Sequence, residues 1–72
     1  MSSKIGEKIK KLRQQKKMSQ DRLSKKADLA LNTIVKIETG ENPNPTLETL
    51  QKVAKALGVS TDQLLKDNPN KL

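Results

Sequence analysis

Four residues near the middle of the chain have side chains of the kinds that contact the edges of DNA bases. Asn32 can make two hydrogen bonds to adenine, and Lys36 can donate to O6 and N7 of guanine. Leu31 and Val35 suit the methyl group of thymine if they are exposed, although Leu31 could instead pack over the preceding turn. An exposed leucine beside an exposed valine favours an apolar contact surface. The predicted base-contacting residues are Leu31, Asn32, Val35 and Lys36.

The composition offers little for catalysis. The chain contains no His and no Cys, which removes the commonest general base, the commonest metal ligand and a thiolate nucleophile. Glu38 has no second carboxylate or base beside it to support acid–base chemistry. We therefore predict that the protein is not an enzyme, holds no metal or cofactor and has no evident small-molecule ligand.

Positive charge is concentrated in the first half of the chain. Residues 1–36 contain eleven Lys and Arg against three Asp and Glu, a net charge of +8, whereas residues 37–72 carry −1. Such an imbalance is expected for a polyanion partner, either a nucleic acid or an acidic membrane surface, but lysine-rich helices can also serve solubility alone. The cations that could neutralise phosphates are Lys16, Lys17, Arg22, Lys25 and Lys26.

The length and hydropathy of the chain predict one small domain without aromatic residues in its core. Seventy-two residues are too few for two domains. Hydrophobic residues make up 32% of the chain, and none of them is Phe, Tyr or Trp. No apolar run approaches the roughly 18 residues of a membrane-spanning helix, and no signal peptide is visible. A cytoplasmic protein that does not enter membranes is the expectation.

Apolar spacing and capping residues predict an all-α fold of five short helices. These helices span about 3–16, 20–26, 30–39, 46–57 and 60–65. Ser19, Thr46 and Ser60 are suitable N-caps, with Ser2 or Ser3 before the first helix, and glycines follow the third and fourth helices. The predicted core face of the fourth helix contains Leu47, Leu50, Val53, Ala54 and Leu57. We assign residues 1–66 to the domain and 67–72 to a flexible tail.

Residues 20–39 have the arrangement of a helix-turn-helix, in which the second helix enters the major groove. A wider pattern extends beyond these residues in both directions. It comprises Ile9, Leu12, Arg13, Met18, Ser19, Gln20, Leu23, Ser24, Ala27, Thr33, Ile34, Ile37, Glu38, Gly40, Pro45, Leu47, Leu50, Val53, Ala54, Ala56, Leu57, Gly58, Val59, Ser60, Leu64 and Leu65. This pattern resembles the Cro/CI-type, or Xre-type, transcriptional regulators. The resemblance implies a lambda-repressor-like five-helix bundle that binds double-stranded DNA sequence-specifically as a homodimer on a two-fold symmetric operator, most often as a repressor.

The resemblance also implies roles for individual residues. Arg13 and Glu38 match an internal ion pair that ties the first helix to the recognition helix. The residues predicted to contact the DNA backbone, from the resemblance and from their side-chain chemistry, are Gln20, Lys25, Thr33, Thr39, Asn42 and Asn44. Two positions depart from the family: Asp28 stands where the turn often has Gly, and Ala30 replaces a Ser or Thr that would cap the recognition helix and meet a phosphate.

Two further questions stay open at this point. The dimer contact is expected near Val59, Leu64 and Leu65, unless these side chains close the core of the monomer. The same fold could instead bind another protein, as an antitoxin or a coactivator-like module does. Binding to a membrane surface is disfavoured because the basic helix lacks aromatic anchors.

Overall fold

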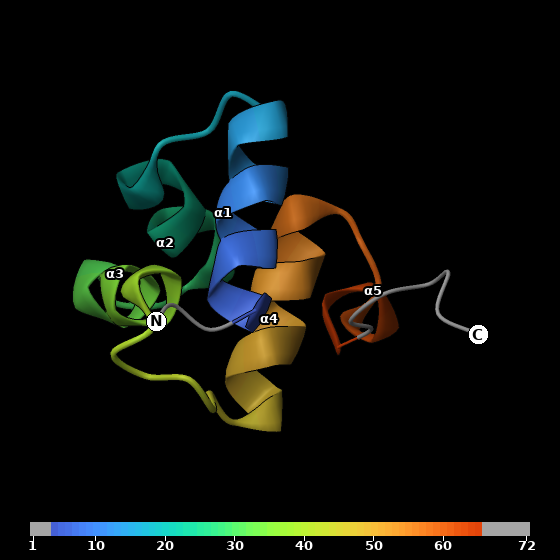
Figure 1. The fold of residues 1–72 in the computed structure, drawn as a ribbon. Helices are drawn as coiled ribbons and strands as arrows, with labels where there is room; N and C mark the ends of the chain where they lie inside the picture. Colours follow the sequence, from blue (N-terminus) through green and yellow to red (C-terminus); the bar gives the residue numbers. More distant parts are fainter. Residues whose placement is uncertain (1–3, 66–72) are drawn as a thin grey trace.

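The computed structural model describes residues 4–65, and these residues form five α-helices and no strand. The helices are α1 (Lys4–Gln15), α2 (Gln20–Ala27), α3 (Leu31–Thr39), α4 (Leu47–Leu57) and α5 (Thr61–Leu65) (Figure 1). The predicted all-α, five-helix fold is confirmed. The proposed Ser2 or Ser3 cap and the predicted tail at 67–72 lie outside the described residues.

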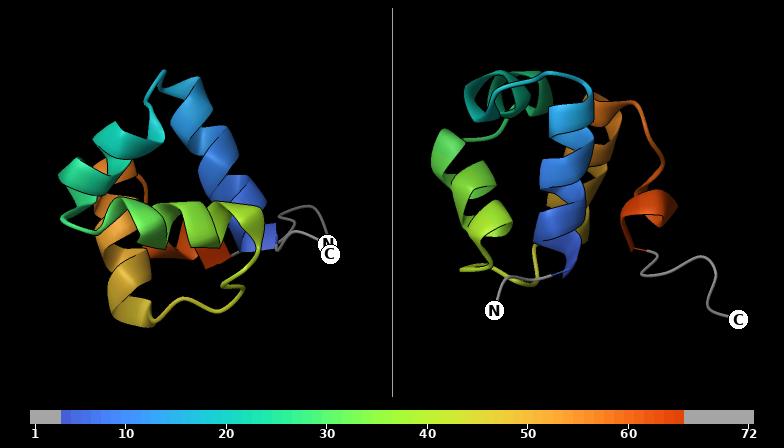
Figure 2. Two further views of the ribbon diagram at one scale, coloured as in Figure 1. Left: turned by 90° about the vertical axis from the view of Figure 1, so that its left-hand side faces the viewer. Right: turned by 45° about the horizontal axis from the view of Figure 1, so that its top comes forward.

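All five helices contribute side chains to a single core. The buried cluster consists of Ile9, Leu23, Ile34, Ile37, Leu50, Val53, Ala54, Leu57 and Leu64. Helix α3 packs against α1 and α2, while α4 packs against α2 and α5. The two views in Figure 2 show α3 on the outside of this assembly, so one of its faces is held by the core and the other is presented outward.

One predicted core residue is at the surface. Leu47 was expected on the buried face of the fourth helix, but its side chain is 58% exposed. Leu47 is the first residue of α4, directly after the cap Thr46, whereas Leu50, one turn further along the helix, is buried. The helical repeat predicts the direction of a side chain but not whether another helix lies opposite it.

Capping side chains set the starts of three helices. The Oγ of Ser19 accepts from the backbone N–H of Arg22 at 3.0 Å, and the Oγ1 of Thr46 accepts from Thr49 at 3.2 Å. Ser60 and Gln63 form a reciprocal pair, in which each side-chain oxygen accepts from the other residue's N–H. Helix α3 differs, because its N-cap Ala30 makes no side-chain hydrogen bond.

Among residues 4–65, four left-handed residues stand at helix ends, and two of them are not glycine. Gly40 and Gly58 have φ of 87° and 74°, as expected after helices. Asp28 ends α2 with φ 59°, so the helix-turn-helix keeps its turn without glycine. Lys17, just after α1, has φ 55°, a conformation that the sequence does not predict.

We expect Lys17→Gly to raise the free energy of unfolding by about 1 kcal/mol, because glycine lacks the Cβ that makes the left-handed region costly. Asp28→Gly should give a smaller gain, since aspartate tolerates that region better than most residues. Urea denaturation followed by circular dichroism measures both changes. Destabilisation by Lys17→Gly would contradict the strain assigned to Lys17.

The opposite substitution at the end of α4 should destabilise the fold. We expect Gly58→Ala to lower the free energy of unfolding by about 1 kcal/mol, because alanine is strained at φ 74°. A Cβ at this position would meet no atom within 4 Å, so the effect isolates backbone strain from crowding. An unchanged urea midpoint would show that the turn relaxes without a penalty.

Candidate DNA-binding surface

Helices α2 and α3 are joined by a short turn at residues 28–30 and pack directly against each other. The N–H of Asp28 donates to the carbonyl of Lys25 at 3.2 Å, and the N–H of Leu29 donates to that of Ser24 at 2.9 Å. These bonds satisfy carbonyls at the end of α2 and direct the chain into α3. Buried Ile34 and Ile37 then hold the inner face of α3 in the core.

The outer face of α3 presents three of the four predicted base-contacting residues. Asn32 and Lys36 are exposed, and Leu31 is 42% exposed. Val35 is half-buried rather than exposed as predicted. It lies three residues before Glu38, which is buried, so Val35 is at the border between the inner and outer faces of the helix.

The predicted backbone-contacting residues of α2 and α3 lie in different surroundings. Gln20 and Thr33 are half-buried. Lys25 is exposed and forms an ion pair with Asp21 one turn earlier, with 3.2 Å between Nζ and Oδ2. An exposed pair of this kind is weak, so Lys25 can exchange its partner for a phosphate at little energetic cost.

The loop after α3 is held to the last turn of that helix by hydrogen bonds to the carbonyl of Lys36. The hydroxyl of Thr39 donates to the carbonyl of Lys36 at 3.3 Å, and the N–H of Asn42 donates to the same carbonyl at 3.0 Å. Asn42 is half-buried, while Asn44 and Glu41 are exposed. Asn44 is therefore the asparagine of this loop whose side chain is more accessible to a ligand.

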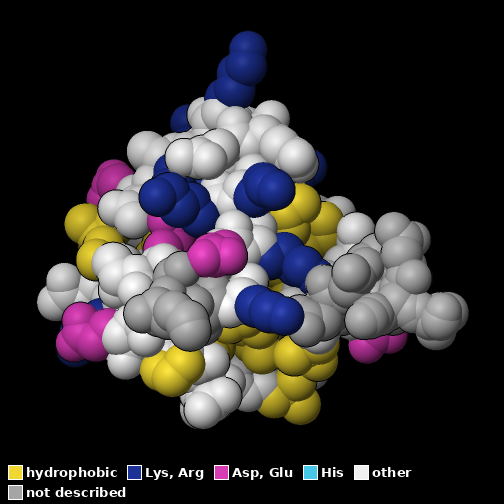
Figure 3. All heavy atoms as spheres, in the orientation of Figure 1, with side chains coloured by type: hydrophobic (Ala, Val, Ile, Leu, Met, Phe, Trp, Pro, Cys, Tyr) yellow, Lys and Arg dark blue, Asp and Glu magenta, His cyan; other side chains and the backbone are white. Residues whose placement is uncertain are grey.

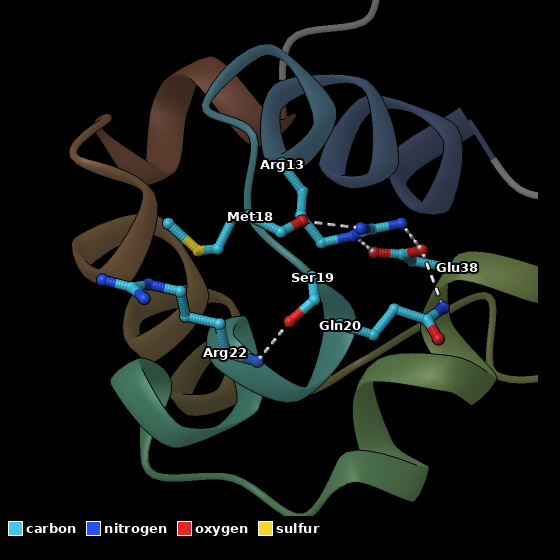
Figure 4. Close-up of polar contacts among 6 residues, drawn as sticks. All are labelled: Arg13, Met18, Ser19, Gln20, Arg22 and Glu38. Atoms are coloured by element: carbon cyan, nitrogen blue, oxygen red, sulfur yellow. Dashed lines mark hydrogen bonds and ion pairs between the residues drawn. The ribbon is translucent and has the colours of Figure 1, made fainter.

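A polar network beneath α3 ties it to α1 and to the start of α2 (Figure 4). Arg13 forms a bidentate pair with Glu38, with Nε to Oε2 at 2.7 Å and Nη2 to Oε1 at 3.0 Å. The Nη1 of Arg13 donates to the carbonyl of Met18 at 2.8 Å, and the Nε2 of Gln20 donates to Oε1 of Glu38 at 3.0 Å. The exposed side-chain fractions are 11% for Arg13 and 2% for Glu38.

This network fixes the orientation of the recognition helix. A buried carboxylate with three donors, supplied by two side chains, has little freedom to change its geometry. The resemblance predicted the pair of Arg13 with Glu38, whereas for Gln20 it predicted contact with the DNA backbone. It missed the Met18 carbonyl, because a main-chain acceptor leaves no signal in residue type.

Two other kinds of feature are absent from the described residues, a metal-ligand cluster and a membrane-spanning helix. Between residues 4 and 65, no group of three His, Cys, Asp or Glu side chains could hold a metal ion. No helix within the same range is long and apolar enough to cross a bilayer.

A capped helix, a tight left-handed turn and a second helix with a polar outer face define a helix-turn-helix domain. The family described as Helix-turn-helix matches residues 9–64 of the chain. The chain belongs to this family, and the Cro/CI type indicated by its sequence is confirmed.

Two similar proteins are regulators, one from a Bacillus phage and one from Bacillus subtilis. The chain is 36% identical over 61 residues to the immunity repressor protein of Bacillus phage phi105 and 36% identical over 63 residues to the HTH-type transcriptional regulator SinR of Bacillus subtilis (strain 168). These alignments cover 85% and 88% of this chain but 42% and 57% of the relatives. The chain therefore spans about half the length of the relatives it matches.

Solved structures of SinR have the same fold. SinR in complex with DNA has a TM-score of 0.83 and 37% identity, covering 86% of this chain and 98% of that one. The complex of SinR with SinI protein has a TM-score of 0.86 and 35% identity, covering 94% of this chain and 66% of that one.

Proposed function

We propose that this protein binds double-stranded DNA sequence-specifically and regulates transcription, with α3 in the major groove. The observation that carries the proposal is the outer face of α3, where Asn32 and Lys36 are exposed while Glu38 anchors the same helix from below. The network holds the end of α3 that carries Lys36, and such support matters because hydrogen bonds to base edges tolerate little displacement. The solved complex of SinR with DNA supports the same assignment.

In the proposed complex, base contacts and phosphate contacts come from different parts of the motif. Asn32 and Lys36 bind base edges, and Leu31 contacts a thymine methyl group. Phosphates are bound around them by Gln20, Lys25, Thr33, Thr39, Asn42 and Asn44. The start of α2 adds the partial positive charge of a helix N-terminus at Gln20. The resulting complex combines sequence preference with salt-dependent affinity.

We further propose that the protein acts in the cytoplasm as a homodimer that represses by occupying a two-fold symmetric operator. Two recognition helices would enter major grooves roughly 34–36 Å apart. Of the three residues expected at the dimer contact, Leu64 is buried in the monomer, whereas Val59 is half-buried and Leu65 is 53% exposed. The proposed contact therefore retains only Val59 and Leu65.

The test is selection of bound duplexes from a randomised DNA pool at about 150 mM salt, where non-specific binding is already weak. Enrichment of a two-fold symmetric motif is the expected result and would also identify the operator. If nothing is enriched and binding is diffuse at lower salt only, the basic half of the chain is a general polyanion surface and the proposal is wrong.

Binding to another protein is the second candidate function. The exposed leucine at the first position of α3 favours it, because Leu31 could anchor a partner as readily as it contacts a thymine methyl. The solved complex of SinR with SinI adds support from a relative. Substituting Leu31 with Ser separates the two functions: DNA affinity should fall only at sites with thymine at the contacted position, whereas a protein contact would be lost regardless of DNA sequence.

A further inference from the structure

The outer face of α1 carries positive charge outside the proposed DNA-binding surface. Its exposed residues recur at the helical spacing, on the side opposite buried Ile9. They are Lys4, Glu7, Lys10, Lys11, Gln14 and Gln15. Figure 3 shows Lys and Arg side chains gathered over α1, with acidic side chains among them. We use the name α1 face for the second half of this surface, which consists of Lys10, Lys11, Gln14 and Gln15.

The lysines of the α1 face have no counter-charge within residues 4–65. Lys10 and Lys11 make no ion pair and no side-chain hydrogen bond there. Glu7 precedes Lys11 by four residues and has an interaction of its own, but it is not paired with Lys11. By contrast, α2 and α4 each contain a lysine that pairs with a carboxylate one turn earlier. The charge of Lys10 and Lys11 is therefore open to an external anion.

The helix dipole does not account for these two lysines. Cations stabilise a helix within its last turn, and in α1 the basic residue of that turn is Arg13. Lys10 and Lys11 precede the last turn, and Lys11 lies three residues from Lys8, a spacing at which like charges repel. Positive charge at these positions therefore contributes little to the stability of α1 itself.

The side chains of the α1 face suit a phosphate backbone better than a protein or a membrane. All four can donate hydrogen bonds, and none is apolar. Contact surfaces between proteins have a core depleted of charge, and helices that lie on membranes need apolar anchors. The chain also has no aromatic residue on which unpaired bases could stack. A double-stranded nucleic acid therefore fits the face, and the proposed function brings duplex DNA to this chain.

The α1 face and the outer face of α3 are turned in different directions. In Figure 1, α1 stands in front of α4 and α3 lies to its left, and the left view of Figure 2 looks onto α3 from that side. One duplex would have to bend to cover both faces, which costs elastic energy. A second duplex reaches the α1 face without bending.

We propose that the α1 face binds the phosphate backbone of a second DNA duplex while α3 occupies the first. This binding is independent of sequence, since contacts to phosphates carry no direct information on the bases. One molecule thereby holds two DNA segments together. The bridging rests on the proposed function, whereas binding of a duplex to the α1 face does not.

The experiment saturates the isotope-labelled chain with the selected duplex at about 50 mM salt and then adds a random-sequence duplex. We expect the second addition to shift the amide signals of residues 10–15 and to leave those of α3 unchanged. Lys10→Gln combined with Lys11→Gln should weaken binding of the second duplex about tenfold and lower the slope of log affinity against log salt by about two. Affinity for the selected duplex should stay nearly the same.

A matched control removes the same charge from another helix. Lys52→Gln combined with Lys55→Gln on α4 should leave binding of the second duplex unchanged. Polyglutamate should bind more weakly than DNA, because its charges are more widely spaced.

Three outcomes would overturn the proposal. The first is an equal loss of second-duplex binding in the α4 control, and the second is polyglutamate binding as tightly as DNA. The third is weaker binding of the selected duplex alone by the variant of Lys10 and Lys11, which would place both faces on one duplex. If selection yields no motif, titration with the random-sequence duplex alone still shows whether the amide signals of residues 10–15 shift.

Discussion

Replacing Glu38 with Ala is expected to lower the free energy of unfolding by about 3–5 kcal/mol. The substitution leaves the guanidinium of Arg13, whose side chain is 11% exposed, without its bidentate partner. It also removes the acceptor of the Gln20 amide. At this partly buried site, hydrogen bonds to Glu38 compensate the charge of Arg13 and the amide of Gln20 for the water that they lose on folding. Without Glu38 that cost is no longer compensated, so the substitution is more damaging than removal of the same number of atoms from the surface. Urea denaturation measures the change.

The double substitution Arg13→Met with Glu38→Leu serves as the matched control. Removing both charges avoids the isolated ion, so the double variant should be more stable than Glu38→Ala. It should nevertheless bind DNA more weakly than the original chain, because packing restores stability without restoring the bond from Gln20 or the fixed orientation of α3. If Glu38→Ala costs less than about 1 kcal/mol, the network is a surface contact and not an anchor of the recognition helix.

Replacing Asn32 with Ala is expected to reduce the preference for one base pair of the selected site by about 1–3 kcal/mol. The side chain is exposed on the outer face of α3, so its loss removes base contacts without disturbing the core. Lys36→Ala should have a similar effect at a different base pair. Competition between duplexes that differ at single positions, at constant salt, measures both preferences. An unchanged preference for Asn32→Ala would show that the recognition face is assigned wrongly.

Lys25→Ala distinguishes base contact from phosphate contact in the same assay. Its loss should weaken binding to every duplex alike and reduce the slope of log affinity against log salt by about one. Since Lys25 is exposed and forms a weak pair with exposed Asp21, its removal should leave the fold unchanged. A change in base preference for Lys25→Ala would instead place it in the groove.

Local rules are sufficient to predict most of the helix boundaries. Ser19, Thr46 and Ser60 each satisfy amide groups within one turn, and Gly40 and Gly58 adopt the left-handed conformation that ends a helix. These signals depend on residues close in sequence, and each acts as the pattern predicts. The pairing of Arg13 with Glu38 was predicted from the family resemblance, since two residues 25 positions apart carry no local signal of a contact.

The departures from prediction concern tertiary surroundings. Leu47 is exposed although its helix face was predicted to be buried, and Val35 is half-buried although it was predicted to be exposed. For Leu64, where a dimer contact and the monomer core both stayed open, the structure places the side chain in the core. Their helical positions determine direction alone, and burial depends on which other helix lies opposite. Lys17 escaped prediction because its left-handed conformation is stabilised by neighbouring backbone bonds, including Met18 N–H to the Arg13 carbonyl at 3.0 Å, and not by its own side chain.

The missing cap at Ala30 makes the two ends of α3 unequal in their expected dynamics. Glu38 near the last turn is restrained by two other segments, whereas the first turn, which carries Leu31 and Asn32, begins without a side-chain cap. Local opening should therefore be easiest at the first turn, and amide hydrogen exchange there should be faster than at Ile37 and Glu38. A recognition helix that is rigid at its C-terminal end and flexible in its first turn can adjust that turn to variations in the geometry of the groove. Each binding event then carries the conformational-entropy cost of ordering the first turn.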